Sequence, residues 1–230
     1  MEHCRENGTD GMMRLWRECF GDDEAYVREY LQKWRPLGKS FVREADGETV
    51  SAADVHMFNS CGIDVAYIFG VMTDRRYRGA GLASSLVSEI LRTTRRDGCC
   101  LAMLIAGDGN LAEWYRGFGF SSRFAEPATL VSPDGSFDFG TGCSEMNKLQ
   151  YRITDVPRYL AIYSARINPA PSGFCVTDPL IEENNGVFSV TGGKVVRCTH
   201  KGAGQQVTVS QLADLCPPGL SHFSYVGRRG

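Results

Sequence analysis

The sequence has no excess of basic residues. Its 230 residues include 25 Lys and Arg against 27 Asp and Glu, which gives a formal net charge of -2. Proteins that bind nucleic acids usually carry a basic surface that neutralises phosphate groups. We therefore expect no nucleic-acid partner for this chain.

The sequence also has no long apolar run. No stretch reaches the roughly eighteen apolar residues that mark a bilayer-crossing helix, and segment 1–7 is polar, without an apolar signal-peptide core. These absences predict a cytoplasmic protein without a membrane span. The composition, 43% hydrophobic and 23% charged, is typical of a globular chain with a packed core.

The cysteines lack the spacing of a metal site. There are nine of them, an odd number, and no Cys-x-x-Cys pair occurs. Cys198 and His200 would supply only two ligands. Disulfide scaffolds are typical of short exported chains, so we expect reduced thiols and no metal.

The first half of the chain shows helical spacing and then strand patterns. Apolar residues recur at helical spacing over 11–34 with a break at 21–23, which predicts two short helices, the second capped by an aspartate. Strand-like runs follow at 40–43, 49–59 and 65–73. Because the links between these runs are short, we expect an antiparallel meander.

The third run leads through a glycine loop into a helix over 82–97 and then a strand over 99–106. This order is a βαβ unit, in which the two strands are parallel. A turn at 133–136 predicts a later hairpin. We therefore expect a mixed α+β and α/β fold that joins an antiparallel meander to a βαβ unit.

A second pattern begins near residue 147. Two helices are predicted at 156–167 and 210–215. The predicted strands of this part are 174–177, 187–191, 194–199 and 206–209. We expect two domains, 1–146 and 147–230, the second a small α+β module that packs on the first.

Gly79 and Gly81 stand between the third strand and its helix. Glycines let a backbone approach a ligand closely, and a helix N-terminus offers unpaired N–H groups to an anion. A pyrophosphate is the natural guest. The spacing differs from the dinucleotide-binding Gly-x-Gly-x-x-Gly, because Ser84 stands at the third position, and no Gly-Lys-Ser/Thr ending of a P-loop follows.

At these residues the sequence resembles the GNAT acetyltransferases. Arg76-x-x-Gly79-x-Gly81 matches their Arg/Gln-x-x-Gly-x-Gly/Ala signature, and the segment from Asn110 through Tyr115 to Gly-Phe120 resembles their Tyr-x-x-x-Gly-Phe segment. The resemblance covers roughly residues 10–145. It implies a splayed sheet with acetyl-CoA as cosubstrate between two central strands.

The resemblance also implies roles for individual residues. Phe69, Gly70 and Val71 would line the pantetheine arm, and a backbone N–H there would polarise the acetyl carbonyl. Asn110 would lie near the pantetheine or the acetyl end, and Tyr115 would protonate the departing thiolate. The residues expected around the pyrophosphate are Arg76, Tyr77, Arg78, Gly79, Ala80, Gly81 and Leu82.

Each of these roles has a structural alternative. Tyr115 could pack in the core, and the arginines of the loop could be a solvated turn. The general base is left open, because four residues on or beside the early strands are candidates. These are Glu44, Asp54, His56 and Asp64.

The C-terminal module resembles the sterol-carrier-protein-like tail of Eis-type acetyltransferases, through the stretches 152–160, 174–178, 185–188 and 207–215. The likeness implies acetylation of amines of aminoglycosides, polyamines or lysines, with the module as a scaffold in preference to a lipid carrier. The tail could also complete a second subunit, which leaves a homo-oligomer open. Glu24, Glu29 and Asp54 would suit a cationic amine if they face the cleft.

These observations favour an acetyltransferase that acts on a small-molecule amine. One alternative is a protein lysine or N-terminal acetyltransferase, which needs an open, shallow acceptor groove. The other is a non-catalytic acyl-CoA sensor or lipid-binding module that keeps the cosubstrate site. An intact Tyr115 argues against the last.

Overall fold

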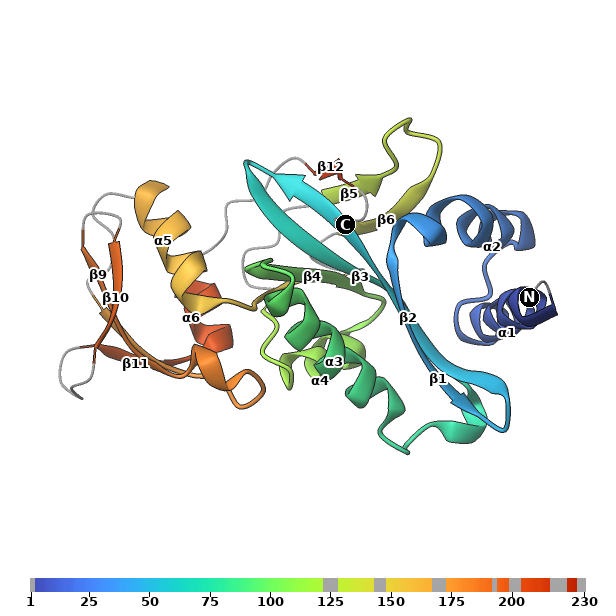
Figure 1. Ribbon diagram of the computed structural model, residues 1–230, viewed down its shortest axis with the longest axis horizontal. Coiled ribbons are helices and arrows are strands. Elements are labelled where there is room, and N and C mark those ends of the chain that lie inside the picture. The colour runs from blue at the N-terminus through green and yellow to red at the C-terminus, as the bar shows by residue number, and fades with distance from the viewer. Residues whose placement is uncertain are drawn as a thin grey trace.

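The computed structural model describes residues 3–121, 128–142, 148–166, 173–191, 194–198, 204–215 and 223–226. Within them, a large twisted sheet occupies the middle of the molecule and a smaller sheet lies at one end, with two helices between the sheets (Figure 1). Helices α1 and α2 lie at the other end. The mixed fold expected from the sequence is confirmed.

The large sheet has six strands in the order β1-β2-β3-β4-β7, with β12 paired to β2. Strands β1 to β3 form the predicted antiparallel meander. Asp46 and Cys61 begin its two turns with positive φ, and each precedes a glycine that also has positive φ, as type I′ hairpin turns require. The strands are β1 (Lys39–Ala45), β2 (Glu48–Ser60), β3 (Ile63–Thr73), β4 (Leu101–Ala106), β7 (Lys148–Ile153) and β12 (Ser224–Tyr225).

Helix α3 (Leu82–Arg96) joins β3 to β4, and these two strands are parallel as predicted. Their pairing is short, because it runs only from Val65 opposite Leu101 to Tyr67 opposite Met103. Beyond Tyr67 the strands separate while each keeps its other neighbour. The central strands of the sheet are therefore splayed.

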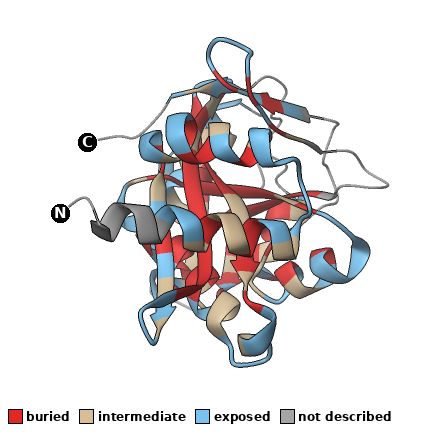
Figure 2. Cartoon of the chain, turned by 90° about the vertical axis from the view of Figure 1, so that its right-hand side faces the viewer, coloured by how far each residue is buried: buried red, intermediate tan, exposed pale blue. Residues whose placement is uncertain are grey.

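Helices α1 (His3–Cys19) and α2 (Glu24–Glu29) cover one face of β2 and β3. Figure 2 shows their exposed outer faces in front of the buried strands. The predicted cap is Asp23, whose carboxylate accepts a hydrogen bond from the Ala25 amide at 2.8 Å. After α2 the chain tightens through a π-helical turn, η1 (Tyr30–Trp34), and a 3₁₀ turn, η2 (Arg35–Leu37).

A helix and a hairpin lie between β4 and β7 in the chain. Helix α4 (Gly109–Arg116) follows β4 directly. The predicted hairpin is formed by β5 (Ala128–Val131) and β6 (Asp138–Gly142), which make a separate two-stranded sheet. Phe137 and Phe139 are buried at this hairpin, against the rings of the α1–η1 region.

The smaller sheet has the order β10-β9-β8-β11. All four of its strands and both helices of this part were predicted. Asp155 caps α5 by accepting from the Arg158 amide at 3.1 Å. The elements are α5 (Val156–Arg166), β8 (Gly173–Thr177), η4 (Glu182–Asn184), β9 (Gly186–Thr191), β10 (Lys194–Cys198), β11 (Gln205–Thr208) and α6 (Val209–Leu215).

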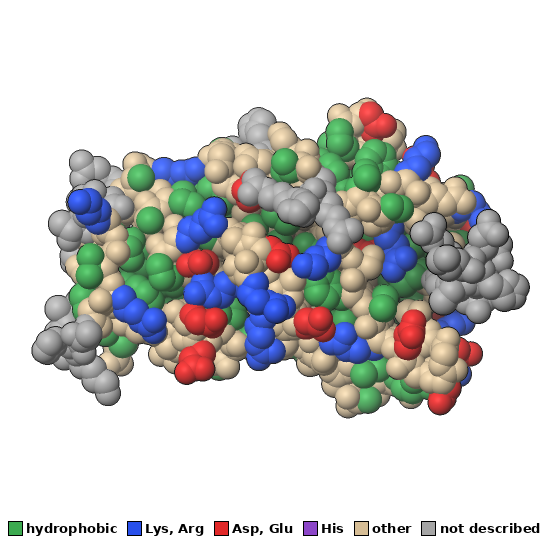
Figure 3. All heavy atoms as spheres, viewed as in Figure 1, with side chains coloured by type: hydrophobic (Ala, Val, Ile, Leu, Met, Phe, Trp, Pro, Cys, Tyr) green, Lys and Arg blue, Asp and Glu red, His purple; other side chains and the backbone are tan. Residues whose placement is uncertain are grey.

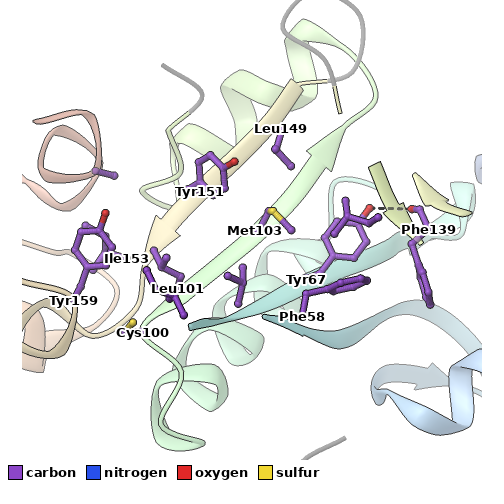
Figure 4. Packing of buried hydrophobic residues seen from close by; sticks show 14 of the residues in the cluster. Phe58, Tyr67, Cys100, Leu101, Met103, Phe139, Leu149, Tyr151, Ile153 and Tyr159 are labelled. Carbon is purple, nitrogen blue, oxygen red and sulfur yellow. Dashed lines mark hydrogen bonds between the residues drawn. The ribbon is translucent and has the colours of Figure 1, made fainter. Parts of the chain in front are cut away.

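Strand β7 joins the two sheets. It begins after residue 147, yet it pairs with β4 along its whole length and leads directly into α5. Its apolar side chains Leu149 and Ile153 are buried in a core that continues to Tyr159 of α5 (Figure 4). The large sheet therefore includes a strand from the predicted second domain, and the boundary at 146/147 stays a prediction.

A buried ion pair also crosses this junction. Arg152 of β7 donates two hydrogen bonds of 2.8 Å to Asp178, which follows β8, and neither side chain is exposed. Breaking a buried pair typically costs about 3–5 kcal/mol. The partly buried Arg95 of α3 pairs with Asp155 at 2.8 Å. Figure 3 shows acidic and basic side chains interspersed on the face that is viewed as in Figure 1.

Candidate active site

A cleft of about 1020 Å³ opens where β3 and β4 separate. Its walls come from α1, α2 and the segment between them, from β3, the loop before α3 and the start of α3, and from β4, α4 and β6. Most of the residues predicted for the site meet here although they are far apart in the sequence. The predicted residues that line it are Phe69, Gly70, Val71, Tyr77, Arg78, Gly79, Gly81, Leu82 and Tyr115.

Strand β3 carries a bulge on the cleft wall. The register between β2 and β3 shifts so that Gly70 and Val71 face the single residue Ala53. Gly70 has a φ of +62°, a left-handed value that favours glycine, and a Cβ there would lie 3.3 Å from the Trp16 ring. The bulge turns the backbone away from the regular ladder next to the cleft.

The first turn of α3, which follows the glycine loop, has no side-chain cap. Gly81 is the N-cap of the helix, with a φ of +79°. A Cβ built on Gly79 or Gly81 would meet nothing within 4 Å. Open space therefore lies over a helix N-terminus that attracts anions.

Arg76 lies outside the wall of the cleft. Its guanidinium group binds Asp74 through two hydrogen bonds of 3.1 and 2.8 Å and Glu48 through one of 2.8 Å. The spacing Arg-x-x-Gly-x-Ala also fits Arg78, Gly81 and Ala83, two residues further on, and these three do line the cleft. The structure therefore favours the later register of the signature at this site. Ala80 is not part of the wall either.

Asp74 holds this loop in place, and its role was not predicted. The buried carboxylate caps the 3₁₀ turn η3 (Arg75–Tyr77) by accepting from the Arg76 amide at 2.9 Å, and it also binds Arg14 of α1 at 2.5 Å. Hydrogen bonds from the Arg76 side chain and backbone, and then from Arg14, hold the pKa of Asp74 well below its usual value. One carboxylate thus links the loop to α1.

Tyr115 reaches the cleft from α4. Asp108 begins this helix by accepting from the Leu111 amide at 2.8 Å, and the Tyr115 ring packs edge-on against Trp114 and Phe120. Burial raises the pKa of Tyr115 above its usual value, so the hydroxyl is protonated at neutral pH. Among the described residues, no hydrogen-bond partner of this hydroxyl is found. Asn110 is exposed on the same helix and is not part of the cleft wall.

None of the four candidate bases lines the cleft. Glu44 is exposed on β1, and Asp64 accepts from the Asn59 side chain at the far end of the β2–β3 hairpin. Asp54 and His56 are buried behind the wall of the cleft.

Asp54 and His56 belong to a buried polar network. The Tyr30 hydroxyl donates to Asp54 at 2.7 Å and lies 2.9 Å from Nε2 of His56, while Nδ1 lies 3.1 Å from the Tyr225 hydroxyl. Burial lowers the pKa of His56 to about 3. A neutral imidazole that donates from Nε2 and accepts at Nδ1 satisfies all these contacts. This arrangement is that of a structural histidine.

A further part of the cleft wall, here called the acceptor end, is mostly aromatic, and no motif in the sequence marks it. Its residues come from α1, the segment between α1 and α2, α2, β3 and β6, so no short motif records them. Trp16 donates from Nε1 to Asp22 at 2.7 Å, and Tyr67 donates to the Phe139 carbonyl at 3.1 Å (Figure 4). The residues are Trp16, Phe20, Asp22, Tyr26, Tyr67, Phe69 and Phe139.

In the described part of the chain, no group of three or more His, Cys, Asp or Glu could hold a metal ion. Burial raises the pKa of the Cys99 thiol to about 11 and that of Cys100 to about 12, which makes both poor nucleophiles. Across the same residues, no helix is long and apolar enough to span a membrane.

Comparison with known proteins gives matches to both the sequence and the fold. Residues 1–123, just over half of the chain, match the family model of the acetyltransferase (GNAT) domain. A curated relative is the glucosamine 6-phosphate N-acetyltransferase of Trypanosoma brucei brucei, which is 26% identical over 106 residues, 45% of this chain and 71% of that protein.

Similar solved structures extend over both sheets. Eis1 from Mycobacterium abscessus has a TM-score of 0.68 at 17% identity, over 94% of this chain and 88% of that one. A GCN5-related N-acetyltransferase from Kribbella flavida has a TM-score of 0.64 at 15% identity, over 97% of this chain and 92% of that one. At these identities the likeness is one of fold.

Proposed function

The chain belongs to the GNAT acetyltransferase family, and from that premise we propose that it acetylates the primary amine of a small molecule, with Tyr115 as the general acid. It is an acetyl-CoA-dependent N-acetyltransferase. The observation that carries the proposal is the single cleft, which runs from the open start of α3, past Tyr115, to an aromatic pocket.

The start of α3 suits the pyrophosphate of acetyl-CoA. The uncapped first turn offers backbone N–H groups, and the space over Gly79 and Gly81 leaves room for phosphate oxygens. Arg78 adds a positive charge on the wall of the cleft. We infer that residues 77–84, with Arg76 as a support through Asp74, bind this part of the cosubstrate.

The bulge of β3 suits the acetyl end. Phe69, Gly70 and Val71 line the splayed gap between β3 and β4, and Tyr115 lines the same cleft from α4. When an amine attacks the thioester, negative charge develops on the carbonyl oxygen, and a backbone N–H of the bulge can stabilise it without reorganisation. Binding both substrates side by side removes much of the entropic barrier.

Tyr115 then completes the proton balance. As the C–N bond forms and the C–S bond breaks, the protonated hydroxyl donates its proton to the sulfur and regains one from water. The raised pKa keeps that proton available. The proton lost by the attacking amine passes to water, since none of the four candidate bases lines the cleft.

A concave, aromatic acceptor end favours a small amine over a protein substrate, which needs a shallow groove. The name of the trypanosomal relative, a glucosamine 6-phosphate N-acetyltransferase, supports the same class. The similarity to Eis1 over 94% of the chain supports an Eis-like arrangement, in which residues from 147 on form a sterol-carrier-like scaffold.

Calorimetric titration of acetyl-CoA, followed by a thiol-release assay with a panel of amines, tests the proposal. We expect saturable binding and thiol release with small primary amines. Release only with lysine peptides would favour protein acetylation, and binding without release from any amine would favour a sensor. If acetyl-CoA does not bind, the proposed function is wrong.

A further inference from the structure

The charged group and the aromatic rings on the wall of the acceptor end favour some amines over others. The cosubstrate end carries Arg78 and the positive end of α3. At the acceptor end, Asp22 is the carboxylate that lines the wall. Asp108, the other described carboxylate of the cleft, is engaged as the N-cap of α4. Arg78 is partly neutralised by Glu18 of α1 at 3.9 Å, so the wall favours an anion chiefly at the start of α3 and a cation beside Asp22.

Asp22 is held in position and retains an unneutralised charge. Its Oδ2 atom accepts from Nε1 of Trp16 at 2.7 Å, and the Trp16 ring contacts Phe69 with a centroid separation of 5.5 Å. Among the described residues, no Lys, Arg or His forms an ion pair with Asp22. The carboxylate is exposed, so it can accept further hydrogen bonds from a bound ammonium group.

The other predicted acidic residues do not add to this charge. Glu24 pairs with Arg17 at 3.0 Å and with Arg28 at 2.6 Å, and Glu29 pairs with Lys33 at 3.1 Å. None of these five residues lines the cleft. An acceptor with several positive charges therefore meets one free carboxylate and not three.

Aromatic rings supply most of the remaining wall. Trp16 and Phe20 lie edge-on with centroids 5.3 Å apart, and Tyr26 stacks on Phe137 at 4.7 Å with 17° between the planes. The Tyr26 hydroxyl is already engaged, because it donates to the Asp138 carbonyl at 2.9 Å. Such walls favour flat apolar groups and nearby cations, and they offer few partners to the hydroxyl groups of a sugar.

We propose that the acceptor is a primary monoamine on a flat, apolar body, which lies between the aromatic walls. Asp22 binds the amine as its ammonium ion; the ammonium group then loses a proton to water, and the neutral amine leaves Asp22 and attacks the thioester. The proposal rests on the proposed function and narrows its substrate class. Asp22 is an acceptor-binding residue, and Trp16 positions it.

The test compares phenethylamine with butylamine, spermidine, kanamycin and glucosamine 6-phosphate in the thiol-release assay. Phenethylamine should have the highest kcat/KM. Butylamine keeps the ammonium group but lacks the ring, and its kcat/KM should be at least about tenfold lower. The sugar amines should be lower again, because the walls leave their hydroxyl groups without partners.

The variant Asp22→Asn should raise the KM for phenethylamine by about tenfold or more, because an amide cannot pair with the ammonium group. Asp23→Asn is the matched control, since asparagine caps α2 as well as aspartate does. The control should change KM less than about twofold. Acetyl-CoA affinity should be unchanged in both variants.

Failure of the proposed substrate class can be distinguished from failure of the proposed function. If acetyl-CoA binds but spermidine or a sugar amine is the preferred acceptor, the substrate class is wrong while the acetyltransferase stands. The same holds if Asp22→Asn has no effect on KM. If acetyl-CoA binds but no amine of the panel is acetylated, this inference is wrong and the sensor alternative is favoured. Failure of acetyl-CoA to bind would overturn the proposed function itself.

Discussion

The two ends of the cleft are built from different parts of the chain. The α3 end is formed by residues of one continuous segment, 77–84, in which no side chain caps the N–H groups of the first turn of α3. The acceptor end consists of side chains from five separate elements or segments, fixed by ring packing and a few hydrogen bonds. A backbone site tolerates changes of side chain that leave its N–H groups accessible, whereas a side-chain site changes its preference with each substitution.

Between the two ends stands Tyr115, and its removal should have the largest effect. Tyr115→Phe deletes the proton donor, so kcat should fall by about 10² to 10⁴ while the Kd of acetyl-CoA is unchanged. Because burial raises the pKa of Tyr115, wild-type kcat should not decline near pH 10 through this group. Steady-state kinetics and calorimetry measure both quantities.

Tyr163→Phe, in the remote helix α5, is the control for loss of a tyrosine hydroxyl. It should keep full turnover. Full turnover of Tyr115→Phe with a slow acceptor would show that another group protonates the sulfur.

A negative charge at the α3 end should weaken cosubstrate binding without destabilising the helix. Ser84→Glu places a carboxylate in the first turn of α3, where the helix dipole favours it. The same carboxylate would repel the pyrophosphate, so the Kd of acetyl-CoA should rise by about 100-fold. Calorimetry measures the Kd, and a thermal melt should show no loss of stability.

Ser85→Glu is the matched control one residue further on. Ser85 is exposed and is not part of the cleft wall. Equal losses of affinity in the two variants would mean that the phosphates do not lie at this helix end.

A smaller effect is expected from the carboxylate that supports the loop. Asp74→Asn removes the charge that binds Arg76 and Arg14, so the Kd of acetyl-CoA should rise roughly tenfold. Glu48→Gln, which changes the exposed partner of Arg76, should have less than about a twofold effect. Equal effects of the two variants would contradict the supporting role of Asp74.

Asp74 also makes a prediction about pH. Its pKa is lowered in the folded protein, whereas an unfolded aspartate titrates near pH 3.9. The unfolded chain therefore binds the proton more readily, and the stabilisation is present above about pH 4 and lost as the pH falls below it. Asp74→Asn should lack this part of the acid sensitivity in urea unfolding curves.

The smallest effect should come from the network behind the acceptor wall. The ring of Tyr225 stacks on Phe139 with centroids 5.6 Å apart, and its hydroxyl binds His56. Tyr225→Phe keeps the stack and loses one hydrogen bond, worth about 1 kcal/mol. The KM for the amine should rise a few fold, with the Kd of acetyl-CoA unchanged. A change in the Kd of acetyl-CoA that exceeds the change in the KM for the amine would contradict this prediction.

The same contrast explains what could be predicted from the sequence. Turn residues such as Asp46-Gly47 and the apolar face of α3 are local signals, and they predicted the meander and the βαβ unit. The Gly-x-Gly loop is also a local signal, and its glycines line the cleft. Arg76 and Arg78 both fit the spacing of the signature, and the sequence could not show that Arg78 lines the cleft while Arg76 binds Asp74.

Features that depend on distant contacts could not be predicted in this way. In the sequence, the pattern of β7 predicts the start of a second domain, and only its pairing with β4 assigns it to the large sheet. Asp22 and Phe139 are separated by more than a hundred residues, so nothing in the local pattern of either marks a shared pocket. His56 was one of four candidates for the general base, and its alternating position in the strand does not show that the rings of Phe69 and Phe139 pack around it.

The separation of β3 and β4 has a further consequence for the peptide groups beside it. Past Tyr67 and Met103, each strand turns an unpaired edge toward the other, so the sheet has two edges in its interior. Exposed edges normally invite pairing with another chain. Here they face a narrow gap, where an extended guest with amide groups of its own can take the place of a missing strand. Amide hydrogen exchange along residues 68–71 and 104–106 should therefore slow when the cosubstrate binds.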